Sequence, residues 1–439
     1  MATRFSDLPT EIWLVIAHYL PKSQLFELKS LNSFFLSCWL TIRWKEITIN
    51  TLFPDRTVDL LMRVLDPFVV TRTKTLNICL KATKSISFDD AHSVLLQSLP
   101  LLPAVTSLKI ELHKSAASHF TTLFRTIACS PSFSRTLQSL LLSATVEMLQ
   151  LLAEHTAHYL PFQNLTHLAL GLIDLRLLDP FSSHTEIPVT SNEVAPFLLF
   201  LAPTLQSLRI TTSFDLSPLF DALTQPSPSP TFPNLKSLFL IFLPSPSTQS
   251  TPQFLRRFLV THNNTLQHLH LRLEMNRIRP TTLDTPLDAW LAELVNINSP
   301  FPSLQTLDIY PLYTQSSLFA LLTLLKRTAP TLSSLSISSR YLTADEARQV
   351  LDALTERGHG TQVRIKQEQG KLKSLCMDIT HLSVPFLDLL SRKLPHLEKL
   401  ALRVSEVVGS DQVSFFFFYP PLGFGLQYAS SFYMTKLKT

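Results

Sequence analysis

The pattern Leu-x-x-Leu-x-Leu recurs along most of this 439-residue chain and constrains its fold more than any other feature. Copies and conservative variants of it start 25 to 40 residues apart. A self-similar segment of roughly 20–50 residues is typical of a solenoid, in which each repeat buries its apolar face against the next. The copies begin at Val105, Leu137, Leu165, Leu205, Leu235, Leu266, Leu304, Leu332, Leu372 and Leu397.

Each copy predicts a short strand, because alternation places its two last apolar side chains on one face and the residue between them on the other. Between the copies, apolar residues recur at spacings of three and four, which predicts amphipathic helices. A doubly wound sheet of unrelated βα units is the alternative, and the 7 glycines and the lack of a phosphate-binding loop disfavour it. Helices are expected at 91–99, 117–128, 146–159, 193–201, 253–259, 287–295, 316–326, 344–355 and 384–393.

This alternation resembles the leucine-rich-repeat family in its long, helix-containing variety. The resemblance implies an α/β solenoid over residues 73–408, of about ten or eleven units, with a curved parallel sheet inside and helices outside. The family's asparagine, which follows the pattern by three residues, is replaced here by Thr145, Ser213 and Glu274, among others. An irregular arc is therefore expected.

The N-terminal segment, residues 5–48, carries a second pattern. Leu8-Pro9-x-Glu11-Ile12-x-x-x-Ile16-x-x-x-Leu20-Pro21 is followed by leucines at 25, 28 and 31. This pattern is similar to the F-box motif, although the family's usual Cys/Ser, basic residue and Trp are replaced by Asn32-Ser33-Phe34-Phe35. Residues 49–72 are interpreted as a linker and N-terminal cap, and around them a short strand is expected at 42–49 and a helix at 57–65.

The F-box resemblance implies a trihelical segment that docks onto a Skp-type adaptor and so onto a cullin complex. An F-box followed by leucine-rich repeats implies a substrate-recognition subunit of a cullin-type (SCF-like) ubiquitin ligase. The alternative is a non-catalytic scaffold whose N-terminal helices only cap the solenoid. The positions that would supply adaptor contacts and core are Leu8, Pro9, Ile12, Ile16, Leu20, Leu25 and Leu28.

A target protein would bind on the concave face of the sheet, to which the middle residue of each Leu-x-Leu points. A mixed lining of charged and aromatic residues suits protein recognition, in which a few aromatic or Arg side chains dominate the affinity. The target itself is unknown. The candidate target-binding residues are Lys109, Arg209, Phe239, His270, Arg272 and Asp308.

Catalytic chemistry finds no support in the sequence. His268 and His270 share one face of a strand, but a metal pair needs further ligands and none is indicated, so they are interpreted as solvent-facing. The chain has no metalloprotease, nucleophile-elbow, phosphate-loop or dinucleotide motif. We therefore expect no enzyme activity, no cofactor and no metal.

Composition narrows the partners and the compartment. The net charge of +5 is mild for this length, so nucleic acid is not an expected partner. No run of 18 apolar residues or signal-peptide pattern is present, so no membrane contact is expected. The 4 cysteines are far apart and are interpreted as buried free thiols, which favours the cytoplasm or nucleus. The aromatic-rich tail, residues 409–439, is interpreted as either a C-terminal cap or a poorly ordered segment that does not belong to the authentic protein.

Overall fold

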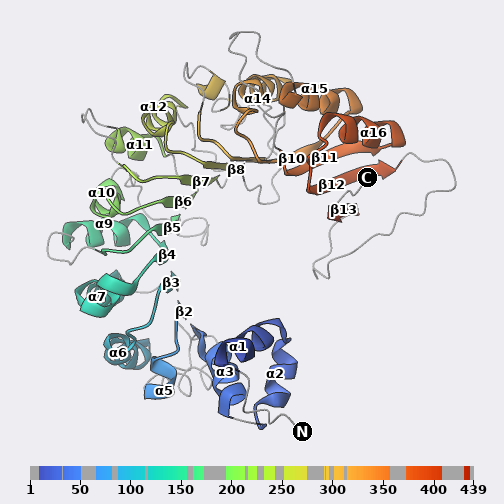
Figure 1. The fold of residues 1–439 in the computed structure, drawn as a ribbon. Helices are drawn as coiled ribbons and strands as arrows, with labels where there is room; N and C mark the ends of the chain where they lie inside the picture. Colours follow the sequence, from blue (N-terminus) through green and yellow to red (C-terminus); the bar gives the residue numbers. More distant parts are fainter. Residues whose placement is uncertain are drawn as a thin grey trace, which may run out of the picture. The chain divides into compact units, whose positions relative to one another are not determined.

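The computed structural model describes residues 9–31, 33–50, 66–81, 88–113, 117–155, 162–172, 194–212, 216–224, 232–242, 252–273, 291, 293–295, 301–310, 314–355, 372–407 and 430–435. The chain divides into two compact units, Met1–Thr166 (unit 1) and His167–Thr439 (unit 2). Both contain parallel strands in chain order, with helices in the connections between strands (Figure 1).

Unit 1 starts with three helices and continues into a parallel sheet in which β1, β2, β3 and β4 pair in sequence order. The strands are β1 (Glu46–Asn50), β2 (Thr75–Lys81), β3 (Ser107–His113) and β4 (Ser139–Ala144). The helices are α1 (Thr10–Tyr19), α2 (Lys22–Leu28), α3 (Ser33–Trp44), α5 (Pro67–Val70), α6 (Phe88–Ser98), α7 (Ala117–Cys129), α8 (Pro131–Thr136) and α9 (Val146–His155), with a 3-10 turn at Leu99–Leu101.

Unit 2 continues the same alternation, with parallel pairing of successive strands from β5 to β12 and an antiparallel last strand, β13. The strands are β5 (His167–Leu172), β6 (Ser207–Thr212), β7 (Ser237–Phe242), β8 (His268–Leu273), β9 (Thr306–Tyr310), β10 (Ser334–Leu342), β11 (Ser374–Leu382), β12 (Lys399–Val407) and β13 (Ser430–Thr435). The helices are α10 (Ala195–Leu201), α11 (Ser217–Leu223), α12 (Pro252–His262), α14 (Gln315–Thr328), α15 (Ala344–Thr355) and α16 (Val384–Lys393).

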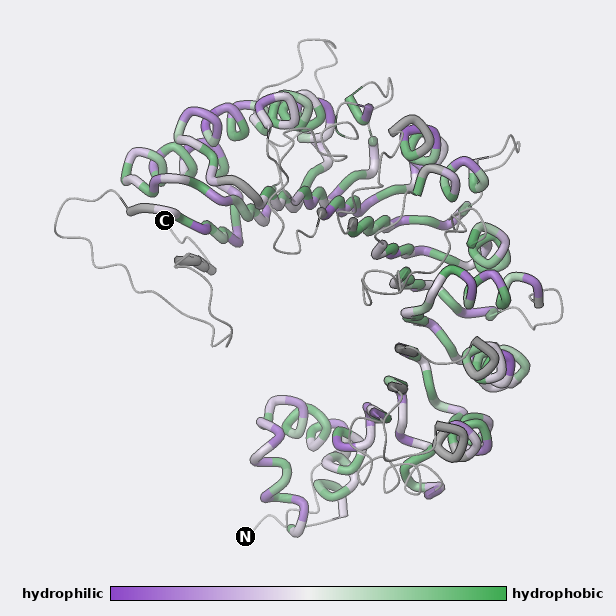
Figure 2. The backbone as a smooth tube through the Cα atoms, turned by 180° about the vertical axis from the view of Figure 1, so that it is seen from behind, coloured by the Kyte–Doolittle hydropathy of each residue, from purple (hydrophilic) through white to green (hydrophobic). Residues whose placement is uncertain are grey.

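The core of each unit lies between the sheet and its helices. The leucines and isoleucines of the repeated pattern are almost fully buried, as for Leu208, Leu238 and Leu269, and hydrophobic residues are prominent along the strands in Figure 2. Phenylalanines fill the remaining space: Phe258 of α12 packs against Phe220 and Phe232, with ring centroids 5.1 and 5.8 Å apart. Each repeat thus buries its apolar face against its neighbours, which explains why the pattern recurs.

Main-chain hydrogen bonds join successive repeats just before each strand begins. In unit 2 one carbonyl oxygen accepts two N–H groups from the next repeat; for example, Gln206 O accepts from Lys236 N at 2.8 Å and from Ser237 N at 2.9 Å. The backbone supplies these joints, so no asparagine side chain is needed for them. The acceptors of such paired bonds are Gln206, Lys236, Gln267, Gln305, Ser333 and Lys373 in unit 2, and Lys45, Lys74 and Thr106 in unit 1.

The α/β solenoid-like arrangement predicted from the repeats is confirmed at this coarse level, but several boundaries differ. A strand was expected at 42–49, whereas α3 continues to Trp44 and β1 begins at Glu46. The short helices α8 and α11 were not predicted. Strand β13 lies in the aromatic tail, which lacks the repeat pattern. A helix expected at 57–65 lies outside the described residues.

Candidate binding surfaces

Helices α1–α3 surround a small core of their own. Ala17, Leu25 and Phe35 are buried at its centre. Leu20 and Leu28, both predicted as adaptor-contact or core residues, pack against this centre and are half-buried. Leu20, Leu25 and Leu28 therefore contribute to the core of the helical segment.

The opposite side of α1 is exposed although it is apolar. Ile12 is 46% exposed and Ile16 36%, and Pro9 is exposed as well, so these three predicted contact residues are accessible; Leu8 lies outside the described residues. Val15 and Tyr19, which the sequence reasoning missed, complete one stripe at helical spacing with Ile12 and Ile16. We call these four residues the α1 stripe.

The sequence around α1 contains two sets of apolar residues at helical spacing, and this indicates that the helix is apolar on two faces. Trp13, Ala17 and Leu20 are spaced by four and three residues and face the core. A second set with the same spacing, starting at Ile12, must then point elsewhere. A helix that is apolar on two sides needs a second surface to cover it.

A hollow of about 270 Å³ lies between α2 and α3. Its lining combines cations with aromatic rings: Lys22, Leu25, Phe26, Trp39, Ile42 and Arg43. The ammonium group of Lys29 lies 3.4 Å from the centroid of the Phe26 ring, and the Arg43 guanidinium carbon lies 5.0 Å from that of Trp39. The trihelical segment thus also presents a basic and aromatic surface.

The second candidate surface is the face of the unit 2 sheet on which the middle residues of Leu-x-Leu lie. Strand pairing places these residues directly side by side, as predicted. We call them the central row: Ala169, Arg209, Phe239, His270, Asp308, Ser336, Cys376 and Ala401. Lys109 occupies the equivalent position in unit 1, where its Nζ lies 2.8 Å from Glu111 Oε1.

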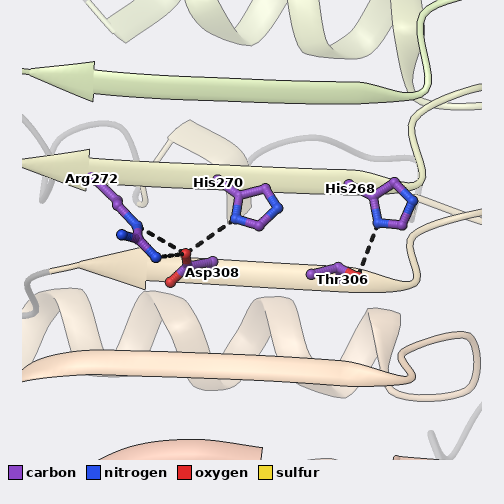
Figure 3. A network of polar contacts seen from close by, with 5 residues as sticks. All are labelled: His268, His270, Arg272, Thr306 and Asp308. Atoms are coloured by element: carbon purple, nitrogen blue, oxygen red, sulfur yellow. Dashed lines mark hydrogen bonds and ion pairs between the residues drawn. The ribbon is translucent and has the colours of Figure 1, made fainter. Parts of the chain in front are cut away.

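A carboxylate organises the middle of this face (Figure 3). The Asp308 side chain is only 5% exposed, because His270 and Arg272 from β8 reach across to it. His270 Nδ1 lies 3.1 Å from Asp308 Oδ2, and Arg272 donates to the same oxygen from Nε at 2.9 Å and from Nη2. The Phe239 ring stacks on His270 at 4.0 Å. Asp308 therefore orients His270 and Arg272, and little of its own side chain remains accessible.

Burial and these donors act in opposite directions on the pKa of Asp308. Burial alone would raise it, but the hydrogen bonds from His270 and Arg272, with the Arg272 charge, bring the pKa below its ordinary value. The carboxylate is therefore ionised at neutral pH. Burial lowers the pKa of His268, as does the nearby His270, and His268 Nδ1 lies 2.9 Å from Thr306 Oγ1. The two histidines are thus half-buried and engaged, not simply solvent-facing.

A second arginine–aspartate pair lies on the same face. Asp378 of β11 is 4% exposed, and Arg403 Nη1 of β12 lies 3.4 Å from its Oδ2. On the same strand as Asp378, burial raises the pKa of the Cys376 thiol, which favours its protonated form. Cys376 is half-buried and Cys129 exposed, so the expectation of four buried thiols is wrong; none of the four cysteines forms a disulfide.

Within the described ranges, no three or more His, Cys, Asp or Glu residues are grouped so that they could hold a metal ion. A search of the same residues finds no helix with the length and apolar character required to cross a membrane.

No protein-family model and no curated protein matches this sequence. Among solved structures, a protein from Bacteroides fragilis, determined by a structural genomics consortium, is similar with a TM-score of 0.33 and 12% identity; the match covers 84% of this chain and 75% of that protein. A similarity this weak carries no argument about function.

Proposed function

We propose that the protein is the substrate-recognition subunit of a cullin-type (SCF-like) ubiquitin ligase. Helices α1–α3 would bind a Skp-type adaptor, and the central row of unit 2 with its neighbours would hold the target protein. The protein itself would catalyse nothing. Its contribution would be proximity, since holding a target beside the transferase replaces a bimolecular encounter by an intramolecular one.

The α1 stripe is the observation that carries this proposal. Ile12, Val15, Ile16 and Tyr19 leave a contiguous apolar surface exposed on a segment whose own core is already filled. Exposed apolar patches of this kind mark interaction sites, because leaving such surface in water is unfavourable. Ile12 and Ile16 are also positions of the F-box resemblance, which supports a Skp-type adaptor as the partner that covers the stripe.

The alternative is a non-catalytic scaffold in which α1–α3 only cap the repeats. It is favoured by the direct continuation of α3 into β1, whose residues pair with β2, the next strand of unit 1. A capping segment protects the end of a repeat array from solvent. The two proposals differ in whether the α1 stripe binds another subunit.

Co-purification of the full chain with a Skp-type adaptor tests this difference. The double variant Ile12→Asp/Ile16→Asp should weaken adaptor binding by at least about thirtyfold, because each charge would be buried in the interface. A matched control is Phe319→Asp/Val384→Asp, which places the same charges on exposed apolar residues of α14 and α16. The control should bind like wild type.

Two results would contradict the proposal. If the wild-type chain does not bind the adaptor, the scaffold alternative stands. If the Ile12→Asp/Ile16→Asp variant binds as well as wild type, the α1 stripe is not the contact surface. Thermal unfolding of both double variants shows whether the repeats remain folded.

A further inference from the structure

On the sheet face of unit 2, the arginine side chains are much more exposed than the aspartate side chains with which they pair. Both aspartates are sunk into the face: the side chains of Asp308 and Asp378 are 5% and 4% exposed. The arginines stand above them, with 49% of Arg272 and 45% of Arg403 exposed. A partner approaching this face therefore meets guanidinium groups and not carboxylates.

The arginines also retain unused hydrogen-bond donors. A guanidinium has five N–H groups in a planar fork. Asp308 occupies Nε and Nη2 of Arg272, and Asp378 occupies one Nη1 bond of Arg403. Arg209 of β6 is exposed, and no residue in the described part of the chain pairs with it. Donors thus exceed acceptors on this face, and the Asp308 Oδ2 atom already accepts three bonds.

The spacing of these groups suits a chain rather than a single small anion. Arg209 and Arg272 lie two strands apart, or about 10 Å, and Arg272 and Arg403 four strands apart, or about 19 Å. Between Arg209 and Arg272 the stacked Phe239 and His270 rings provide a partly apolar surface. A ligand that engages all three arginines must carry several acceptor groups along an extended backbone.

We propose that this face recognises carboxylates of an acidic, extended polypeptide segment, with Arg209, Arg272 and Arg403 as the anion-binding residues. The proposal rests on the proposed function in naming the class of target captured there. The planar carboxylate matches the arginine fork in two parallel hydrogen bonds. Asp308 and Asp378 act as positioning residues, because they hold two of the forks in place. Nucleic acid is disfavoured, because binding to a phosphate backbone relies on a strongly basic protein and the net charge of +5 is mild for 439 residues.

Selection from a phage-displayed library of random ten-residue peptides on the immobilised full chain tests this proposal. The expected result is an excess of Asp and Glu, at least about threefold over the unselected library, consistent with charge-assisted hydrogen bonds to Arg. The variant Arg209→Gln/Arg272→Gln/Arg403→Gln should lose that excess. The control Arg257→Gln/Arg348→Gln/Arg392→Gln removes the same charge from α12, α15 and α16 and should keep it.

Single substitutions keep the test decisive if the triple variant does not fold. Arg209 has no described partner, so Arg209→Gln should leave the thermal midpoint unchanged and weaken a selected peptide by about tenfold, as expected for one charge-assisted contact. Unchanged affinity would overturn the proposal, as would a wild-type selection without acidic excess. Neither result depends on the adaptor, so failure here is distinct from failure of the ligase assignment.

Two further measurements distinguish recognition of carboxylates from recognition of phosphate groups and of RNA. Replacing Glu by phosphoserine in a selected peptide should change its affinity by less than about tenfold; tighter binding beyond that factor would assign the site to phosphate instead. Polyuridine RNA at equal nucleotide and peptide concentrations should not displace the peptide. Displacement would overturn the assignment to a polypeptide.

Discussion

His262, the last residue of α12, shows how one side chain of unit 2 couples folding to pH. It is buried against Phe232 and Phe258, with ring centroids 5.9 and 4.3 Å away. Its Nδ1 lies 2.8 Å from the Phe258 carbonyl oxygen, and its Nε2 accepts the Phe232 N–H at 3.3 Å. Both ring nitrogens are satisfied by the neutral imidazole, since the carbonyl needs a donor and the N–H an acceptor.

Burial lowers the pKa of His262, although the hydrogen bond to Phe258 opposes the shift. The unfolded chain therefore takes up the proton first as pH falls below about 6.5. The His262 contribution to stability is fully present above that pH and is lost progressively down to the folded-state pKa. We expect the urea midpoint to fall between pH 7.5 and 5, and less so in His262→Gln than in the exposed control His396→Gln. Equal slopes in both variants would exclude His262 as the titrating group.

For Asp308, the sequence predicts on which face of the sheet the side chain lies but not that the side chain is buried. Its place in the central row follows from the Leu-x-Leu pattern, because alternation fixes which face a side chain occupies. Its burial does not follow, since the covering residues His270 and Arg272 come from the preceding repeat, 38 and 36 positions away in sequence. Only the register between β8 and β9 brings these groups together.

At the scale of elements, long periodic segments were predicted well and short ones were missed. Strands β3 to β12 each contain the Leu-x-Leu of their copy, and helices α15 and α16 match their expected ranges. In both cases the periodic segment is complete enough to show its period. Helices α8 and α11 have 6 and 7 residues, too few for a 3.6-residue period to show. Their signals were Pro131 and Pro218, each in the first turn, where proline is favoured.

Helix α15 also begins with a reciprocal cap. Thr343 Oγ1 accepts the Glu346 N–H at 3.3 Å, and Glu346 Oε2 accepts the Thr343 N–H at 2.9 Å. These bonds satisfy donors that the first helical turn leaves free. Glu346 Oε1 additionally accepts Gln315 Nε2 at 2.6 Å, which ties α15 to α14.

Removing this cap should destabilise unit 2 measurably. We expect Thr343→Ala to lower the free energy of unfolding by about 1 kcal/mol, the usual effect of losing an N-cap hydroxyl. Thr323→Ala, at a half-buried position in the interior of α14, is the control and should be neutral or slightly stabilising, because Ala favours helix. Chemical denaturation of both variants measures the difference. Equal effects would show that the Thr343 bonds contribute nothing beyond helix propensity.

At the scale of the whole molecule, each strand pairs with the strands of adjacent repeats and the contacts are correspondingly local. The order of parallel strands within each unit was predictable from the repeat. The antiparallel β13 was not, because backbone pairing with β12 requires no Leu-x-Leu pattern. The division of the chain at Thr166 also has no marker in the sequence.

Because each strand pairs only with its neighbours, a destabilising substitution in one repeat should affect mainly the adjacent repeats. Leu238 of β7 is fully buried, so Leu238→Ala should cost about 2–5 kcal/mol locally. In a repeat array stability propagates mainly to nearest neighbours. Hydrogen exchange should therefore accelerate most in β6, β7 and β8 and least in β11 and β12. Leu199→Ala, an exposed site on α10, is the control, and uniform acceleration across unit 2 would indicate all-or-none unfolding instead.

The paired main-chain hydrogen bonds that precede the strands do not depend on the type of residue that accepts them. One carbonyl oxygen accepts two N–H groups of the next repeat whether the residue is Gln206, Lys236 or Gln267. Since the side chains of these residues take no part in the paired bonds, substitutions at these positions leave the bonds between successive repeats intact. The sequence of such a protein can diverge until no characteristic residue remains at these acceptor positions, while the fold is preserved.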